Sequence, residues 1–321
     1  MTELFLGIDG GGTKTLATIC NSDGRVLGTG AGGPSNVDDV GTEAASVNID
    51  QAVRAAREQA LSGNQGFVAC FLGLAGVVSA QDRDLIRQMA LTLALAPPDR
   101  IGVHHDGHVA LAGGLSGRSG AVLIVGTGSS CYGVSGCESW RAGGWGSLIS
   151  DEGSGYFLGR EGLSAAVRAL DGRGPPTLLA AALLEELKVH RPDDLLHRLY
   201  VTGLSRSGVA ALAPLVLDAA GRGDAVANDL VEQGCGLLAE CVGAVAGHLL
   251  LEQLELVIVG GLYTASPLVQ SLLNRTVTTR LPGCRIVPPE LPPVLGACLL
   301  ALQLNGPVVA ATLQRLSTNT L

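Results

Sequence analysis

LGIDGGGTKT, residues 6–15, decides the fold, because an apolar strand runs into a turn of glycine and threonine and out into a second strand. LIVGTGSS, residues 123–130, repeats this arrangement in the second half of the chain. Glycine has no Cβ and reaches positive φ, so the backbone N–H groups of such a turn can close on a phosphate oxygen, while Thr or Ser adds a hydroxyl donor. Either turn alone could be an ordinary hairpin. The repeated pair predicts a nucleotide held between two lobes.

Two better-known glycine motifs do not fit these turns. A P-loop reads G-x-x-x-x-G-K-[ST], but Ile8 and Thr13 occupy its glycine positions. The dinucleotide fingerprint G-x-G-x-x-G fails because Thr15 and Cys131 stand where the third glycine would be. Both motifs also open a helix, whereas TLATIC, residues 15–20, is typical of a strand.

Composition sets the class of protein. A length of 321 residues suggests two domains, and 47% hydrophobic residues allow a large interior. A net charge of −8 without a basic run argues against a nucleic acid partner. The amino terminus lacks a basic segment and the apolar stretches are too short to cross a bilayer, so we expect no membrane partner and a cytoplasmic location. None of the eight cysteines forms C-x-x-C, and reduced thiols are expected.

Hydrophobic periodicity predicts the element order βββαβαβα twice, with extra helices in the second copy. The first copy is expected to have strands at 4–9, 15–20 and 26–30, a helix at 42–61, a strand at 67–74, a helix at 82–95, a strand at 101–105 and a helix after Asp106. The second is expected to have strands at 121–125, 131–134 and 139–142, helices at 154–170, 177–188, 206–221 and 224–251, a strand at 255–259, a helix at 267–280, a strand at 285–287 and a helix from Val294.

A duplicated α/β unit of this order, with a cleft between the copies, is the ribonuclease H-like architecture of actin, hexokinases and heat-shock ATPases. We therefore expect a smaller lobe at 1–117 and a larger lobe at 118–321. A final helix near 308–316 could cross back onto the first lobe.

Seven segments follow one another in the order of a known motif series: IDGGGTKT (8–15), GGPSN (32–36), HHDGHVALAGG (104–114), IVGTGSSC (124–131), GGWGSLISDEGSGYFLG (143–159), IVGGL (258–262) and PPVLGACLLAL (292–302). The series resembles that of the N-acetylglucosamine kinase group in the BadF/BadG/BcrA/BcrD-type ATPase family. Only residues 160–255 lack a diagnostic motif. The resemblance implies an ATP-dependent kinase that phosphorylates the 6-hydroxyl of an amino sugar, most simply N-acetylglucosamine. It also implies ATP and Mg²⁺ as cofactors and a homodimer.

Two aspartates are the candidate reacting groups. Asp106 closes a strand and begins a helix, where a carboxylate could accept a sugar hydroxyl proton or merely cap the helix. The resemblance makes it the catalytic base. Asp9 ends the first strand beside the glycine turn and is expected to hold magnesium through water, although it could instead cap the turn.

The sugar and nucleotide residues follow from the same motifs. Planar polar groups and one aromatic face suit a sugar, and Asn36 and the pair Asp151-Glu152 can bond to its vicinal hydroxyls. The resemblance places Asn36, Gly144, Trp145, Gly146 and Asp151 at the sugar. Trp145 could instead fill the core, and Glu152 could cap the helix that starts near Ser154. The residues expected to contact ATP are Gly11, Gly12, Thr13, Lys14, Gly126, Thr127, Gly128, Ser129, Gly260 and Gly261. Lys14 could also be merely solvated, and Gly260-Gly261 could be only a strand-to-helix turn.

The sequence excludes one related family and leaves other activities as alternatives. ROK-type sugar kinases share D-x-G-G-T-K, but their E-x-G-H segment and cysteine-rich zinc loop do not occur in this chain. An activator ATPase of 2-hydroxyacyl-CoA dehydratases and a sugar sensor without turnover are the alternatives from other classes. The sugar itself could also be glucosamine or another hexose, since these differ in one or two contacts.

Overall fold

The computed structural model describes residues 2–189 and 191–318, and it divides into two compact units. Unit 1 comprises Met1–Val122 and Pro288–Leu321, and unit 2 comprises Leu123–Val287. Each unit contains one five-stranded sheet. The units are described separately below.

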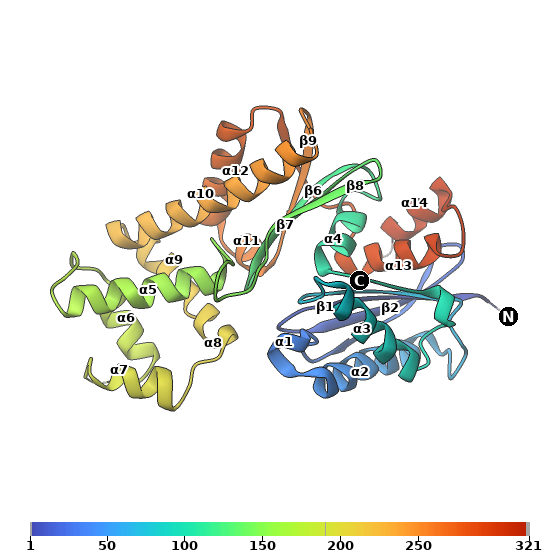
Figure 1. The fold of residues 1–321 in the computed structure, drawn as a ribbon, viewed down its shortest axis with the longest axis horizontal. Helices are drawn as coiled ribbons and strands as arrows, with labels where there is room; N and C mark the ends of the chain where they lie inside the picture. The colour runs from blue at the N-terminus through green and yellow to red at the C-terminus, as the bar shows by residue number, and fades with distance from the viewer. Residues whose placement is uncertain (1, 190, 319–321) are drawn as a thin grey trace. The chain divides into compact units, whose positions relative to one another are not determined.

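Unit 1 is built on the first glycine turn. Its strands are β1 (Leu4–Gly10), β2 (Thr15–Asn21), β3 (Val26–Gly32), β4 (Ala69–Leu74) and β5 (Ile101–His104). They lie in the order β3-β2-β1-β4-β5, with β1 antiparallel to β2 and parallel to β4. A hairpin therefore opens the sheet, and the later parallel strands are added on the other side of β1 through helical connections (Figure 1).

Helices cover both faces of this sheet. They are α1 (Val37–Val40), α2 (Thr42–Ala60), α3 (Ala80–Thr92), the 3₁₀ turn Pro98–Arg100, α4 (Asp106–Gly114), α13 (Pro293–Gln303) and α14 (Ala310–Thr318). The apolar faces of α2 and α3 form one core with the sheet, while α13, α14 and Val109 of α4 form a second core on the opposite face (Figure 1). β4 is buried along its whole length, as expected for a strand covered on both sides.

The return of the chain's last segment to unit 1 depends on small residues. A Cβ at Gly7 of β1 would lie 2.4 Å from the backbone nitrogen of Cys298, and a Cβ at Gly296 would lie 2.1 Å from the carbonyl of Val109. Only glycine permits such close packing of α13 on β1 and α4. Contacts thus group residues 288–321 with the first unit. The expected division was 1–117 and 118–321, with a final helix near 308–316 that could cross back onto the first lobe.

Unit 2 repeats the topology. Its strands are β6 (Gly120–Val125), β7 (Ser129–Ser135), β8 (Glu138–Gly143), β9 (Leu254–Val259) and β10 (Cys284–Val287), in the order β10-β9-β6-β7-β8. Read from the other edge, the third, second, first, fourth and fifth strands of each unit lie in the same order. The predicted duplication, and with it the α/β fold class, is confirmed.

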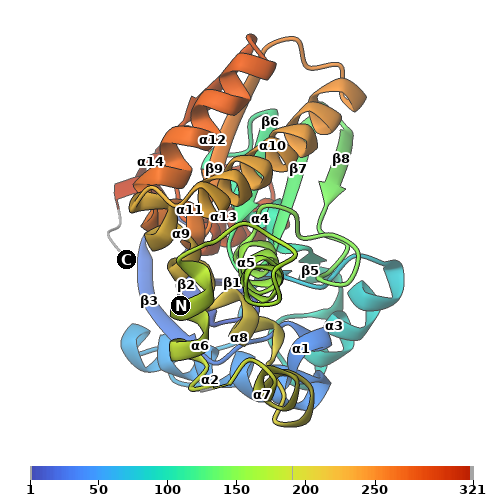
Figure 2. The same ribbon diagram turned by 90° about the vertical axis from the view of Figure 1, so that its left-hand side faces the viewer.

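The helices of unit 2 follow its first three strands. They are α5 (Gly155–Leu170), α6 (Leu179–Glu186), α7 (Asp194–Leu196), the π-helical turn His197–Val201, α8 (Arg206–Ala210), α9 (Ala213–Gly221), α10 (Ala225–His248), α11 (Gly261–Ala265) and α12 (Pro267–Arg280). α10 packs against α12, β7 and β8 (Figure 2). It is the one described helix long and apolar enough to cross a membrane, a test that core helices of globular proteins also pass.

The main error in the predicted helices lies at 206–221, which was expected to be continuous. The structure has two helices there, and Pro214 stands in the first turn of the second. Proline lacks an N–H and clashes with the preceding turn, so it fits a helix start but not a helix interior. The short helices α1, α7 and α11 were not predicted, because one turn carries too little periodicity to recognise.

Candidate functional site

The first glycine turn connects β1 and β2. The Gly11 N–H donates to the Lys14 carbonyl (3.1 Å), and the Gly11 carbonyl accepts the N–H groups of Ser35 (3.0 Å) and Asn36 (3.3 Å). Thr13 and Lys14 are exposed. The turn is therefore fastened to the segment that carries the predicted sugar asparagine.

One premise about the glycine turns was wrong. Positive φ was expected, but neither Gly11 and Gly12 nor Gly126 and Gly128 has a positive φ. Glycine is suited to these positions because it has no side chain, and not because of its backbone conformation. A Cβ at Gly11 would meet nothing within 4 Å, so the surface of the first turn is open to a ligand.

Thr15 and Ser35 form a buried polar pair that the sequence analysis did not single out. The Thr15 hydroxyl contacts the Ser35 hydroxyl (2.8 Å) and the Gly33 carbonyl (2.7 Å). Both side chains are fully buried. They fix β2 against the GGPSN segment, and the only sequence signal was the polar residue at the start of an apolar strand.

Asn36 is buried at the start of α1. Its side-chain oxygen accepts the Asp38 N–H (3.1 Å), and its amide nitrogen donates to Asp39 (2.9 Å). A Cβ at Gly12 would lie 3.1 Å from that same Asp39 carboxylate. The predicted sugar residue and the predicted phosphate turn of unit 1 thus belong to one hydrogen-bonded cluster.

Asp9 is the electrostatically unusual group of unit 1. Burial first, and then the negative charge of Asp106, raise its pKa to about 7, while the charge of Lys14 lowers it. The side chain lies on β1, paired across the sheet with Leu16 and Gly73, and not in a turn. Two carboxylates that disfavour each other's charge are a suitable place for a cation.

Asp106 is the first residue of α4, and the residue at the N-cap position is His105. The Asp106 carboxylate accepts the N–H of the next residue, Gly107 (2.8 Å), which is not the bond of a helix cap to the second or third amide. The N-cap position of α4 thus belongs to His105, and Asp106 occupies the first helical position. The strand-to-helix junction carries its carboxylate beside Asp9.

Three histidines surround this junction. His104 stacks on His108 (ring centroids 4.2 Å apart), His108 lies 5.8 Å from the ring of Phe71, and His104 accepts the His105 N–H at Nδ1 (3.0 Å). Burial lowers the pKa of His104 to about 3, with smaller contributions from the charges of His108 and Arg83, and burial also lowers that of His108. His104 is thus neutral at pH 7 and holds the backbone that leads into Asp106.

The second glycine turn, in unit 2, is fastened in a similar way. Gly126 donates to the Gly128 carbonyl (2.9 Å), and the carbonyls of Gly126 and Thr127 accept the N–H groups of Gly155 (2.8 Å) and Tyr156 (3.1 Å). The buried Ser129 hydroxyl donates to the Glu152 carbonyl (2.7 Å). The turn is joined to the DEGSG segment and the start of α5.

Asp151 is 2% exposed and has a positive φ of 64°. Its carboxylate accepts the Ser129 N–H (3.2 Å) at one oxygen and a guanidinium N–H of Arg206 (2.8 Å) at the other. Arg206 was missed by the sequence analysis, because it lies in the region without a diagnostic motif. Glu152 accepts the Ser150 hydroxyl (2.8 Å), and Ser154 caps α5, so the capping alternative for Glu152 is wrong.

The GGWG segment leaves its tryptophan in solvent. Trp145 is 63% exposed, so it does not fill the core. The Arg141 guanidinium lies 4.6 Å from the Trp145 ring centroid and donates to the carbonyls of Gly143 (2.9 Å) and Gly144 (2.6 Å). Gly144 and Gly146 both have positive φ, which glycine adopts at least cost. An exposed, braced aromatic face is available to a ligand.

Gly260 follows β9 and has a φ of 111°, and a Cβ there would lie 2.4 Å from the Val125 carbonyl. The positive φ and the close contact with the Val125 backbone therefore require glycine at this position, whether or not a ligand binds there. At Gly261, the first residue of α11, a Cβ would meet nothing within 4 Å. Only Gly261 offers the open backbone expected for close approach of an adenosine.

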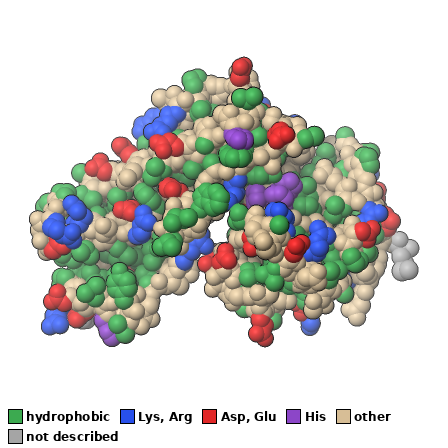
Figure 3. All heavy atoms as spheres, in the orientation of Figure 1, with side chains coloured by type: hydrophobic (Ala, Val, Ile, Leu, Met, Phe, Trp, Pro, Cys, Tyr) green, Lys and Arg blue, Asp and Glu red, His purple; other side chains and the backbone are tan. Residues whose placement is uncertain are grey.

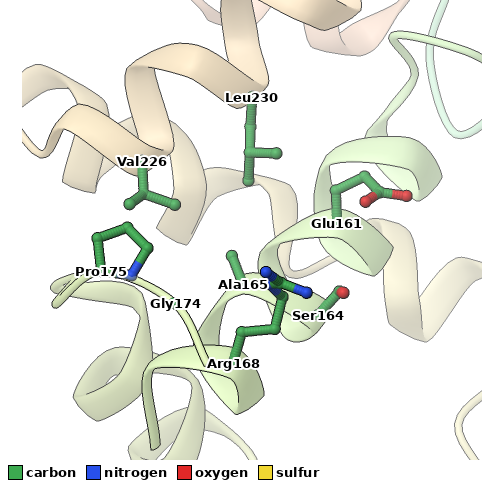
Figure 4. A pocket seen from close by; sticks show the side chains of 8 residues that line it. All are labelled: Glu161, Ser164, Ala165, Arg168, Gly174, Pro175, Val226 and Leu230. Carbon is green, nitrogen blue, oxygen red and sulfur yellow. The ribbon is translucent and has the colours of Figure 1, made fainter. Parts of the chain in front are cut away.

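Other features of the surface do not coincide with the predicted site. A cavity of about 180 Å³ between α5, the Gly174-Pro175 loop and α10 contains none of the predicted residues (Figure 4). Acidic and basic side chains are interspersed on the face drawn in Figure 3. Within residues 2–189 and 191–318, no group of three or more His, Cys, Asp or Glu side chains is arranged to hold a metal ion.

Comparison with known proteins gives the family. The BadF/BadG/BcrA/BcrD ATPase family matches residues 6–301. The chain is 30% identical to the N-acetylmuramic acid/N-acetylglucosamine kinase of Clostridium acetobutylicum, covering 93% of this chain and 98% of that protein. It is 32% identical to the N-acetyl-D-glucosamine kinase of Dictyostelium discoideum, covering 94% and 98%.

A solved structure agrees over the same length. It comes from Chromobacterium violaceum, carries the provisional name N-acetylglucosamine kinase, and superposes with a TM-score of 0.77 at 28% identity, covering 94% of this chain and 99% of that one. The chain belongs to the BadF/BadG/BcrA/BcrD ATPase family, and the resemblance seen in the motif series is confirmed.

Proposed function

We propose that this member of the BadF/BadG/BcrA/BcrD ATPase family is an ATP-dependent sugar kinase that phosphorylates the 6-hydroxyl of N-acetylglucosamine. One observation supports it most: in each unit, the predicted phosphate turn is hydrogen-bonded to the segment that carries a predicted sugar residue, Asn36 in unit 1 and Asp151 in unit 2. The names of the full-length relatives point to the same activity.

The reaction is the transfer of the γ-phosphoryl group of ATP to a sugar hydroxyl. The hydroxyl oxygen forms a bond to the γ-phosphorus, the bond from that phosphorus to the bridging oxygen breaks, and ADP leaves. The hydroxyl proton passes to the Asp106 carboxylate. Because such transfer requires mainly alignment and charge neutralisation, the base has only to orient the hydroxyl while backbone amides of the turns hold the phosphates.

Magnesium fits the carboxylates of unit 1. Asp9 would hold the ion through water, and when bound it would neutralise charge on the phosphates. This proposal is supported by the raised pKa of Asp9, to which the charge of Asp106 contributes: a bound cation would offset that repulsion and favour the ionised form of Asp9.

Sugar recognition is assigned to the polar and aromatic groups near the turns. We propose that Asn36, Asp151 and Glu152 bond to sugar hydroxyls, and that Trp145 with its neighbouring glycines offers the aromatic face. Glucosamine or another hexose is the alternative acceptor; a glucosamine kinase of Vibrio cholerae is 30% identical over 71% of this chain. We further propose a homodimer.

A panel of sugars in a coupled ADP-release assay with ATP and Mg²⁺ tests the proposal. N-acetylglucosamine should give the highest kcat/KM, with glucosamine, N-acetylmuramic acid and glucose lower. ADP release with no sugar dependence, together with absorbance near 400 nm from an iron–sulfur cluster, would indicate an activator ATPase instead. Sugar binding without ADP release would indicate a sensor.

A further inference from the structure

The second glycine turn has no cationic side chain of its own, although a nucleotide phosphate carries several negative charges. Residues 124–131 contain no Lys or Arg. The structure brings one from a distant part of the chain: Arg206, on the short helix α8, places its guanidinium nitrogen 2.5 Å from where a Cβ of Gly128 would be. A side chain at position 128 would occupy the space that this guanidinium uses.

The position of Arg206 is fixed by a buried carboxylate. Asp151 accepts the guanidinium at 2.8 Å and the Ser129 N–H at 3.2 Å, so the arginine, the aspartate and the turn form one hydrogen-bonded group. The Arg206 side chain is 25% exposed, whereas that of Asp151 is 3% exposed. Of the two charged groups, the cation is therefore the more exposed.

We propose that Arg206 binds the phosphates of the nucleotide at the second glycine turn, with Asp151 as the residue that positions it. This inference rests on the proposed kinase function. It adds Arg206, which lies in no motif, to the residues that bind the nucleotide. A guanidinium has five N–H donors in a planar fork suited to phosphate oxygens, so a group bonded to a carboxylate can engage a phosphate as well. The guanidinium is already held beside the turn and would lose little freedom on binding.

A simpler role for Arg206 is to neutralise the buried Asp151 and nothing more. The two roles differ in what happens when both charges are removed together. If Arg206 only neutralises Asp151, replacing both residues by neutral ones should leave nucleotide affinity unchanged. If Arg206 binds phosphate, nucleotide affinity stays low in the double variant even where stability returns.

The test measures the affinity of the full-length protein for MgADP, without sugar, by calorimetry, together with the melting temperature. Arg206→Met should weaken MgADP binding at least tenfold, and Arg206→Lys less, since the charge remains and the fork is lost. In the double variant Arg206→Met with Asp151→Asn, the melting temperature should rise above that of Arg206→Met while affinity stays at least tenfold below wild type. Arg222→Met, at an exposed arginine of the same unit paired with Asp218, should leave affinity unchanged.

Two results would overturn the inference. Wild-type affinity for MgADP in the double variant would reduce Arg206 to a counter-ion of Asp151, and wild-type affinity in a folded Arg206→Met protein would do the same. Wild-type protein that binds no MgADP at all would instead remove the kinase proposal and this inference with it, so the two failures are distinguishable.

Discussion

At the scale of single residues, the most informative feature is the set of neighbours that surrounds each candidate reacting group. Asp106 is preceded by the neutral His104, which accepts the His105 N–H, and Asp9 has a pKa of about 7 because it is buried near a second carboxylate. The first effect is local in the chain, whereas the second comes from residues that the fold brings together. The role of Asp106 as a base and the titration of His104 can therefore each be tested with a single substitution.

Asp106→Asn keeps size and hydrogen bonding but removes the proton acceptor. We expect kcat to fall by about 10²–10⁴-fold while sugar affinity changes less than about tenfold. Steady-state kinetics and calorimetry on the same preparation measure both quantities. Near-normal turnover in a folded variant would remove Asp106 from the role of base.

His104 predicts a pH dependence of stability. Burial lowers the pKa of His104 from its ordinary value of 6.5 to about 3 in the folded protein, so above pH 6.5 its protonation takes nothing from the free energy of unfolding. As the pH falls below 6.5, His104 binds a proton in the unfolded chain but not in the folded protein. The free energy of unfolding therefore decreases progressively towards pH 3. His104→Asn keeps an acceptor for the His105 N–H and cannot titrate.

We therefore expect the free energy of unfolding to fall less steeply between pH 7 and 5 in His104→Asn than in wild type, by at most about 1.4 kcal/mol per pH unit. Urea titrations at several pH values measure the slopes. The exposed His197 is the control, and His197→Asn should keep the wild-type slope. Equal slopes in wild type and His104→Asn would contradict the assignment.

At the scale of elements, the two glycine turns look alike in sequence but differ in their surroundings. A Cβ at Gly12 would meet only the Asp39 carboxylate at 3.1 Å, whereas a Cβ at Gly128 would meet Arg206 at 2.5 Å and Asp151 at 2.7 Å. Alanine at Gly128 must therefore disturb the protein itself. Gly12 is the position where ligand contact can be separated from folding.

Gly12→Ala should raise the KM for ATP at least tenfold with an unfolding free energy within about 1 kcal/mol of wild type, because the added methyl would obstruct a phosphate and little else. Gly128→Ala should lose both ATP use and about 1–3 kcal/mol of stability through overpacking. Urea unfolding and ATP titrations on both variants decide this. An unchanged KM for ATP in Gly12→Ala would leave the first turn without a phosphate.

At the scale of the whole molecule, segments from the first and last parts of the chain pack in one unit. Leu295, Cys298, Leu299 and Leu316 are buried in the core that α13 and α14 form with β1, β4 and Val109. A chain that ends at Val287 would expose this face of the first sheet to water. Loss of so many buried apolar side chains exceeds the stability of an ordinary domain.

Truncation after Val287 should accordingly yield aggregated protein, or protein without a cooperative unfolding transition for unit 1. Truncation after Gly306 removes only α14 and should leave a folded but less stable protein. Expression yield, calorimetry and limited proteolysis distinguish the two truncated chains. A cooperative, wild-type melting profile for residues 1–287 would contradict the assignment of the last segment to unit 1.

The sequence by itself determined the glycine turns, the strand and helix order and the duplication, because these depend on local periodicity and on residues adjacent in the chain. The motif series likewise indicated Asp106, Asn36 and Trp145. The assignment of residues 288–321 to unit 1, the pairing of Arg206 with Asp151, and the pKa values of Asp9 and His104 were decided only by the tertiary structure. Each depends on groups tens to hundreds of residues apart, whose burial and mutual distances no local pattern records.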